Sequence, residues 1–333
     1  MMKAAYYEKT GPADEVLQVG DLADPQPGSG EVLVKIAVSA VHPSDVKTRG
    51  GARGPLAYPM VIPHSDGAGR IVAVGDGVDA GRVGERVWIW NAGWKRAFGT
   101  AAELVALPSD QAVIMPDNVS YSRGATLGIP AVTAHRCLFA DGPIDGMTIL
   151  VTGGAGTVAG AAIQMANRSG ARVIATVSGD QKAEHARRLG ADATVNYRDA
   201  EAIANILAAN GGHGVDRIIE VEFGGNLAIT QAVLAEGGTI VAYGSMAVPE
   251  PVLPFYPMMF ANQTLRGVLA YTIPDHARQQ AEADIHKWLA DGSLAPPIAG
   301  EIPLAEVVAS HEAVEIGNRI GVSLLRIADD TAV

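Results

Sequence analysis

The sequence predicts an α/β protein in which a doubly wound parallel sheet is inserted into a β-rich, barrel-like domain. Three observations predict this. A β-branched strand at 148–152 breaks into glycines and continues as a helix at 158–169. Strands alternate with helices across 123–270, whereas 1–122 holds short strands separated by Pro and Gly. A single late strand, at 322–327, most simply returns to the β-rich part.

Each part has its own predicted elements. In the β-rich part we expect strands at 31–40, 69–74, 86–89 and 101–106. In the alternating part we expect strands at 149–152, 172–177, 193–196, 216–221, 239–243 and 264–270. Helices at 276–290 and 304–316 precede the last strand. The predicted domains are therefore 1–122 with 271–333, and 123–270.

Composition excludes several classes of function. The 333 residues carry 25 Lys and Arg against 36 Asp and Glu, a net charge of −11, which disfavours nucleic-acid and anionic-membrane partners. Cys137 is the only cysteine, which excludes an internal disulfide framework and sites built from several thiolates. No apolar run approaches the ~20 residues of a membrane span, and the first residues lack a signal-peptide core. A cytoplasmic location is expected.

The glycine turn after the strand at 148–152 predicts a dinucleotide pyrophosphate site. Gly153 opens it, and Gly154, Gly156 and Ala159 fit the pattern G-x-G-x-x-G/A. The first glycine of the pattern permits a tight turn, and the second lets the backbone approach phosphate. The helix that follows directs its free N–H groups and positive dipole end at the same point. Phosphate binding then needs no basic residue in the loop.

The end of the second parallel strand favours NADPH over NADH. NAD-selective folds place an acidic side chain there to bind the ribose 2′-hydroxyl, but this strand ends at Ser178. Ser178 leaves room for a 2′-phosphate, and Lys182 lies on the first turn of the next helix. Asp180 counts against phosphate, and Lys182 as an ordinary solvated helix residue remains an alternative.

Several motifs in order resemble the zinc-free branch of the medium-chain dehydrogenase/reductase superfamily, the zeta-crystallin-like NADPH:quinone oxidoreductases. The resemblance covers essentially the whole chain and implies a Rossmann sheet inserted in a GroES-like catalytic domain. The segments that carry it are 63–69, 84–87, 128–134, the glycine turn, 190–198, 237–245 and 311–321.

The resemblance also implies the residues around the cofactor. Lys182 and Tyr197 resemble the pair that contacts the 2′-phosphate, and Thr157 and Val158 correspond to the pyrophosphate turn. The residues that resemble the surroundings of the nicotinamide and its ribose are Thr133, Gly244, Ser245, Leu269, Ala270, Tyr271 and Asn318.

Zinc-dependent relatives hold a catalytic metal that lowers the pKa of an alcohol substrate. The matching positions here are His42, Ser65, Ile129 and Asp66, of which Ile129 cannot ligate and Ser65 ligates poorly. The prediction is no metal. Convergence of His42, Asp66 and His64 on an unconventional metal is the alternative.

The predicted acceptor pocket departs from that of the quinone reductases. His42 stands before Pro43 where those proteins have Asn, and Lys47 follows where they have Tyr. His42 is expected to donate a hydrogen bond to a carbonyl oxygen, and Lys47 to stabilise an oxyanion or bind cofactor phosphate. The alternative is that His42 only caps a turn and Lys47 is solvated.

Three functions follow from these observations. The first is an NADPH-dependent reductase of a quinone or an enone, because hydride transfer to an activated acceptor needs mainly stacking and an oxyanion donor. The second is an alcohol dehydrogenase with an unconventional metal, and the third a non-catalytic NADPH-binding protein. By analogy a homodimer or homotetramer is expected.

Overall fold

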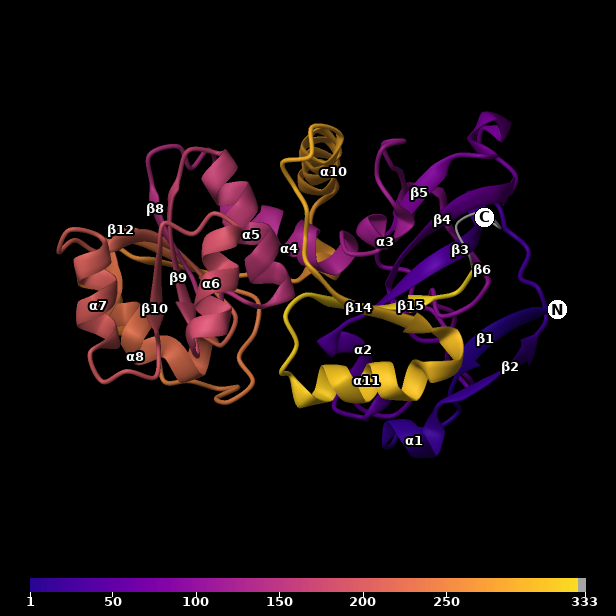
Figure 1. The fold of residues 1–333 in the computed structure, drawn as a ribbon, viewed down its shortest axis with the longest axis horizontal. Coiled ribbons are helices and arrows are strands. Elements are labelled where there is room, and N and C mark those ends of the chain that lie inside the picture. The colour runs from indigo at the N-terminus through magenta and orange to yellow at the C-terminus, as the bar shows by residue number, and fades with distance from the viewer. Residues whose placement is uncertain (329–333) are drawn as a thin grey trace. The chain divides into compact units, whose positions relative to one another are not determined.

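The computed structural model describes residues 1–328, which group into two compact units. The first, the β-rich unit, comprises 1–129, 286–291 and 296–328 of the described chain; the second, the parallel-sheet unit, comprises 130–285 and 292–295. Figure 1 shows the chain order of their elements. The domain borders expected from the sequence, after residues 122 and 270, stay predictions.

The β-rich unit is built on β3, an 11-residue strand with buried side chains along most of its length. Its strands are β1 (Met2–Tyr6), β2 (Gln18–Leu22), β3 (Glu31–Val41), β4 (Asp66–Val74), β5 (Arg86–Ile89), β6 (Leu104–Pro108), β7 (Ala112–Ile114), β14 (Ile298–Pro303) and β15 (Val322–Arg326). Its helices are α1 (Ala13–Val16), α2 (Pro43–Arg49), α3 (Tyr121–Gly124) and α11 (Val307–Ile316). The sheet order is β14-β15-β3-β4-β5-β7, with β6 also paired to β3.

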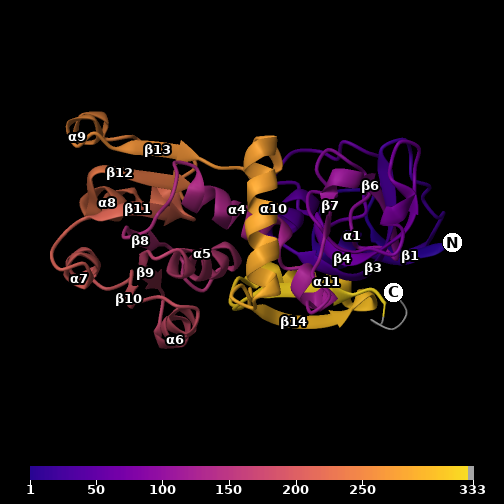
Figure 2. The ribbon, with the colours of Figure 1, turned by 90° about the horizontal axis from the view of Figure 1, so that it is seen from above.

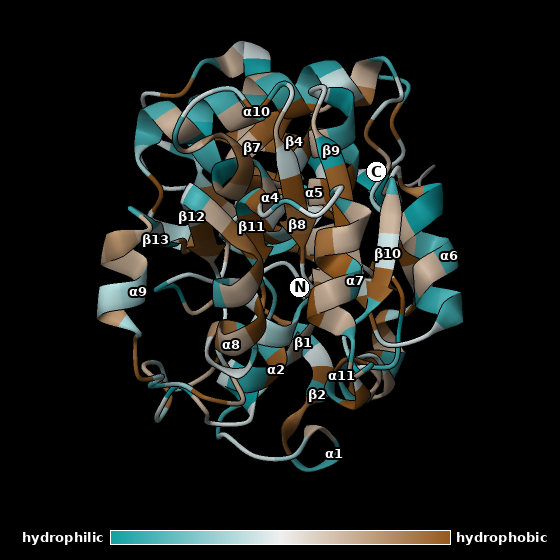
Figure 3. Cartoon of the chain, turned by 90° about the vertical axis from the view of Figure 1, so that its left-hand side faces the viewer, coloured by the Kyte–Doolittle hydropathy of each residue, from teal (hydrophilic) through white to brown (hydrophobic). Residues whose placement is uncertain are grey.

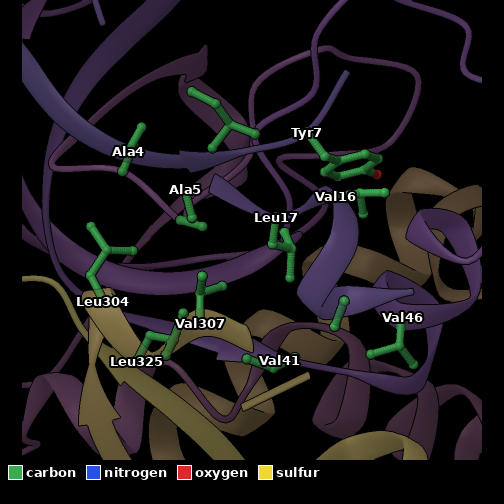
Figure 4. Close-up of a cluster of buried hydrophobic side chains, with 14 of the residues drawn as sticks. Ala4, Ala5, Tyr7, Val16, Leu17, Val41, Val46, Leu304, Val307 and Leu325 are labelled. Atoms are coloured by element: carbon green, nitrogen blue, oxygen red, sulfur yellow. The ribbon is translucent and has the colours of Figure 1, made fainter. Parts of the chain in front are cut away.

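The late strand returns to the β-rich unit, as predicted. β15 pairs antiparallel with β3, in a register that sets Leu324 opposite Ala40. A hydrophobic core joins the two ends of the chain: Figure 4 shows Ala4 and Tyr7 of the N-terminal segment in one cluster with Val307 and Leu325. Residues separated by most of the sequence therefore share one core.

The parallel-sheet unit has the predicted doubly wound topology. Its strands are β8 (Thr148–Val151), β9 (Arg172–Val177), β10 (Ala193–Asn196), β11 (Val215–Glu220), β12 (Leu234–Ala242) and β13 (Thr264–Gly267). They lie in the order β10-β9-β8-β11-β12-β13, and every neighbouring pair is parallel. The order reverses between β8 and β11, and ligands of such sheets bind at the carboxyl ends of the strands beside this reversal.

Helices connect these parallel strands. They are α5 (Thr157–Arg168), α6 (Asp180–Arg188), α7 (Ala202–Ala209), α8 (Phe223–Val233) and α9 (Phe255–Phe260), while α4 (Gly128–Phe139) and α10 (Asp275–Ala290) run across the borders between the units. Strands β8 and β11 are largely hydrophobic in Figure 3, whereas α6 is largely hydrophilic. This contrast is typical of a parallel sheet covered by amphipathic helices.

Four predicted strands were wrong by three or more residues at one end. Two begin earlier than expected, β4 at Asp66 instead of 69 and β12 at Leu234 instead of 239. The expected strand at 101–106 begins only at Leu104, because Ala101 and Ala102 instead bond to Ala5 and Ala4 of β1. The expected strand at 264–270 ends at Gly267, since the chain turns into a short 3₁₀ helix at 270–272. Within residues 1–328, none of the helices combines the length and apolarity that crossing a bilayer requires.

Candidate functional site

The glycine turn connects β8 to α5 as the sequence predicted. Gly153 has φ 64°, in the left-handed region that favours glycine, and the Gly154 N–H donates to the Thr176 carbonyl at 2.8 Å. A Cβ on Gly154 would lie 2.8 Å from the Ala175 Cβ on β9. The turn itself therefore depends on Gly153, while Gly154 is required for close packing against the neighbouring strand.

The start of α5 is open to a ligand. Gly156 is the N-cap residue, and no side chain caps the helix there. Thr157 and Val158 form its first turn, and Ala159, Gly160, Ala161 and Ala162 are buried against the sheet. Uncapped N–H groups at a helix start are donors for an anion, so this turn fits a pyrophosphate.

Ser178, Lys182 and Tyr197 lie around the carboxyl ends of β9 and β10. Ser178 follows the last residue of β9, and the Tyr197 N–H donates to the Val177 carbonyl at 3.1 Å. Lys182 is the third residue of α6, is partly buried, and follows Ser178 by one turn. The structure thus brings these three residues to the same edge of the sheet. This edge lies beside the reversal of strand order between β8 and β11, where a dinucleotide is expected.

The other predicted cofactor residues are divided between the two units. Thr133 is buried on α4, and Gly244 and Ser245 lie two and three residues after the end of β12. Leu269, Ala270 and Tyr271 lie after β13, with Leu269 47% exposed. Asn318 follows α11 in the β-rich unit, one residue after the left-handed Gly317 that ends the helix.

His42 joins β3 to α2 and is almost fully buried. It is the N-cap residue of α2, and its backbone N–H donates to Asp45 Oδ2 at 2.8 Å. The His42 Nε2 lies 2.7 Å from Asp66 Oδ2, at ion-pair distance, with both side chains buried. The same Asp66 oxygen accepts the Ile129 N–H at 2.6 Å. His42 is thus the N-cap residue of α2, and its ring faces the Asp66 carboxylate, while its hydrogen bond to an acceptor carbonyl stays a prediction.

Charge decides the protonation state of this pair. Burial lowers the pKa of His42, but the charge and hydrogen bonding of Asp66, with the charge of Asp45, outweigh burial and raise it above its ordinary value. Burial also raises the pKa of Asp45 to about 6. His42 consequently holds a proton more tightly than an ordinary histidine does.

A second polar chain in the β-rich unit has a fixed direction. The Thr100 hydroxyl lies 2.6 Å from the backbone carbonyl oxygen of Asp66. A carbonyl oxygen can only accept, so the hydroxyl must donate its proton to it. Ser39 must therefore donate to Thr100 and accept from His64 Nδ1, each at 2.8 Å. The remaining His64 nitrogen, Nε2, lies 2.9 Å from His311 Nε2 and accepts its proton. These hydrogen bonds fix the tautomer of each histidine: His64 carries its proton on Nδ1, and His311 carries its proton on Nε2.

His311 and His64 are held neutral by burial. Burial, with the positive potential of His311 and His42, lowers the pKa of His64 well below its ordinary value. Burial and Arg49 lower the pKa of His311 to about 3, and its Nδ1 has no hydrogen-bond partner. His64 also has φ 79°, an uncommon conformation for a residue other than glycine. Both rings are engaged in packing rather than offered to a ligand.

The residues at the zinc positions do not fit a metal site. Ile129 offers no donor atom, and Asp66 Oδ2 is occupied by the Ile129 amide and by His42. His64 turns both nitrogens toward Ser39 and His311 instead of toward Asp66. Among residues 1–328, no three or more His, Cys, Asp or Glu side chains gather so as to hold a metal ion.

Lys47 lies on α2, partly buried, five residues after His42. Trp88 and Trp90 are 0% and 8% exposed, so both pack in the core of the β-rich unit.

Sequence reasoning missed several polar partners. Asp45 could have been found, because an acid at the third position of a helix is a common partner of the N-cap backbone. Ser39, Thr100 and His311 carried no local signal, since their contacts with His64 and Asp66 join distant segments.

Comparison with known families gives two matches. Residues 28–117 match the alcohol dehydrogenase GroES-like domain, and residues 157–289 match the zinc-binding dehydrogenase family. The second description names zinc, but the donor set described above does not fit that metal.

Relatives match along almost the whole length. The quinone oxidoreductase of Homo sapiens is 31% identical over 94% of this chain and 93% of its own, and that of Mus musculus is 31% identical over 92% and 91%. A solved mycobacterial quinone oxidoreductase shares 28% identity with a TM-score of 0.87, covering 98% of this chain and all of that one. An NAD-dependent alcohol dehydrogenase shares 28% with a TM-score of 0.89, over 98% of this chain and 100% of its own.

Fold and site together define a nicotinamide-dependent oxidoreductase of the medium-chain dehydrogenase/reductase type, which acts on a small molecule. Within that superfamily, the chain belongs to the quinone oxidoreductase family.

The neutral histidine pair predicts a loss of stability in acid. The pKa of His311 is about 3 in the folded protein and about 6.5 in the unfolded chain, so between these pH values only the unfolded chain binds the proton. The free energy of unfolding should therefore fall as pH drops from about 6.5 toward 3. The slope is about 1.4 kcal/mol per pH unit for each such histidine. His311→Gln keeps an N–H donor toward His64 but does not titrate. Denaturant unfolding at several pH values should give this variant a shallower slope.

The exposed His276 supplies the control, because His276→Gln should leave the slope unchanged. Equal slopes for wild type and His311→Gln would contradict the assignment of a neutral His311.

Proposed function

We propose that this protein is an NADPH-dependent two-electron reductase of a quinone or a related activated carbonyl compound, working without catalytic zinc. One observation carries the proposal: where an alcohol dehydrogenase needs metal ligands, this chain has Ile129, and its Asp66 is engaged by His42 and by a backbone amide. An acceptor that is already electron-poor needs no Lewis acid to receive a hydride. The relatives named quinone oxidoreductase support the same substrate class.

The proposed reaction adds a hydride and a proton to the acceptor. The bound NADPH supplies the hydride and leaves as NADP⁺. The chain's own residues have to orient the acceptor and provide the proton. Asp66 raises the pKa of His42, and we assign this residue as the proton source for the reduced oxygen, with solvent restoring the proton. Lys47 is assigned to the oxyanion or to a cofactor phosphate.

The preference for NADPH rests on the end of β9. Ser178 replaces the acid that would repel a 2′-phosphate, and Lys182 and Tyr197 lie at the same strand edge. A mycobacterial protein solved in complex with NADPH, 27% identical with a TM-score of 0.87 over 98% of this chain, supports the same cofactor.

A second copy of the chain is the proposed partner of the parallel-sheet unit. Large apolar side chains are exposed on and beside α9: Val252 (92%), Phe255 (65%), Tyr256 (65%) and Phe260 (77%). Figure 2 shows α9 next to β13, the strand at one edge of the sheet. An unpaired edge beside an apolar patch is a surface that association covers. We therefore propose a homodimer formed through this edge.

Turnover with a panel of acceptors tests the function. We expect NADPH oxidation with quinones, with enones as the alternative acceptors. His42→Ala, which removes the imidazole, should lower kcat by about a hundredfold, as loss of a proton donor does. Lys47→Ala should weaken turnover less, and the exposed His276→Asn should not change it.

Failure of every acceptor to oxidise NADPH would reject the reductase assignment. If turnover occurs but neither His42→Ala nor Lys47→Ala alters it, the acceptor lies elsewhere. Zinc in the purified protein, together with alcohol-dependent reduction of NADP⁺, would favour the alcohol dehydrogenase alternative.

Removal of the Lys182 charge tests the cofactor assignment. Lys182→Ala should raise the Michaelis constant for NADPH roughly tenfold, because a charge-assisted contact with phosphate is lost, and leave that for NADH nearly unchanged. Arg188→Ala, at the other end of α6, is the matched control. Steady-state kinetics with both cofactors decide the question, and equal effects of Lys182→Ala on the two would exclude a 2′-phosphate contact.

Charge on the apolar patch tests the dimer. The double variant Phe255→Lys, Phe260→Lys should sediment as a monomer at concentrations where the wild type is a dimer, because burying two ammonium groups is unfavourable. Ile316→Lys, at a residue of the β-rich unit that is 72% exposed, should not change the sedimentation coefficient. A monomeric wild type, or a double variant that still dimerises, would contradict this interface.

A further inference from the structure

The segment 244–248, which follows β12, is fastened to the start of α8 by one carboxylate. Glu222 Oε2 accepts the Met246 N–H at 2.7 Å, and Glu222 Oε1 accepts the Ala247 N–H at 2.9 Å. Two successive backbone amides therefore share a single charged acceptor. Hydrogen bonds to an ionised carboxylate are about twice as strong as neutral ones, so this contact sets the path of the segment.

Close backbone packing supports the same attachment independently. The Gly224 N–H donates to Ser245 Oγ at 2.9 Å, and the Ser245 hydroxyl donates to the Val248 carbonyl at 2.5 Å. A Cβ on Gly224 would lie 2.1 Å from the Val248 carbonyl oxygen, and one on Gly244 would lie 2.4 Å from the Val221 oxygen. The segment 244–248 thus lies directly on the β11–α8 junction, with no space for a side chain between them.

Glu220, two residues before Glu222, makes similar contacts with the end of β8, the strand on the other side of β11. Its Oε1 accepts the Thr152 hydroxyl at 2.9 Å, the Glu222 N–H at 2.6 Å and an Asn226 N–H at 2.8 Å. Thr152 directly precedes the glycine turn. Since β11 lies between β8 and β12, the end of β11 holds the turn after β8 through Glu220 and the segment after β12 through Glu222.

We propose that Glu222 is a positioning residue for the nicotinamide half of the dinucleotide. This inference rests on the proposed function. Ser178 and Lys182 place the adenosine half at β9, on one side of the switch point, so the other half must extend across the reversal toward β11 and β12. The segment 244–248 borders that side, and Glu222 holds it in place before the cofactor arrives. Such preorganisation removes the ordering cost from binding.

The experiment compares a whole cofactor with its adenosine half. Calorimetry gives the dissociation constants of NADPH and of adenosine 2′,5′-bisphosphate for wild type, Glu222→Ala and Glu222→Gln. Glu222→Ala should weaken NADPH binding roughly tenfold and leave adenosine 2′,5′-bisphosphate unchanged, because only the nicotinamide side is loosened. Glu222→Gln should be intermediate, since its single carbonyl oxygen still accepts one amide. Glu236→Ala, an exposed acid on β12, is the control.

Hydrogen exchange of the unliganded protein reports the attachment directly. The Met246 and Ala247 amides should exchange faster in Glu222→Ala than in wild type, with no change in the glycine turn. Unaltered exchange, unaltered NADPH affinity, or equal weakening of both ligands would each overturn the role of Glu222. If the wild type binds neither NADPH nor adenosine 2′,5′-bisphosphate, the proposed function is rejected. The inference about Glu222 is then rejected with it.

Discussion

The central parallel strand β11 is the constraint on which the parallel-sheet unit depends. It pairs with β8 on one side and β12 on the other, and Ile218 and Ile219 are fully buried. Even Arg217 is buried within it, with Nη2 2.9 Å from Asp141 Oδ2. Because both faces are covered, the polar groups at its carboxyl end have to find partners within the protein. The buried Glu220 finds one in Thr152 after β8, and the half-buried Glu222, just after β11, bonds the segment after β12.

A similar constraint acts on the β-rich unit through Asp66. Its side chain is completely buried, and a carboxylate without partners there would be costly. His42, the Ile129 amide and, through the backbone carbonyl, Thr100 surround this residue. The Asp66 carboxylate raises the proton affinity of His42, and its Oδ2 is engaged by His42 and the Ile129 amide. Asp66 therefore accounts for the proposed proton source, and its engaged oxygen, with Ile129 beside it, for the poor fit of zinc.

Local patterns predicted most of the fold and the nucleotide side of the candidate site. The strand, turn and helix at 148–168 were predicted because β-branching, glycine content and helical spacing are properties of neighbouring residues. The start of β6 at Leu104 and the end of β13 at Gly267 were not. Ala101 bonds to Ala5, far away in the sequence, and that pairing decides where β6 begins. Ser178 and Lys182 were predicted from the end of the second parallel strand, and Tyr197 from the family resemblance.

By itself the sequence determined the alternation of strands and helices, the glycine turn with its anion-binding helix start, the missing acid at Ser178 and the non-ligating Ile129. These features depend on residue type and on spacing of a few positions. Only the tertiary structure decided that Asp66 raises the pKa of His42, and that His64 bonds to His311, 247 residues later. It alone showed that Glu222 holds the segment after β12. The physical reason is that burial and partner choice arise only when distant segments pack together, and these set the charge state and orientation of each polar group.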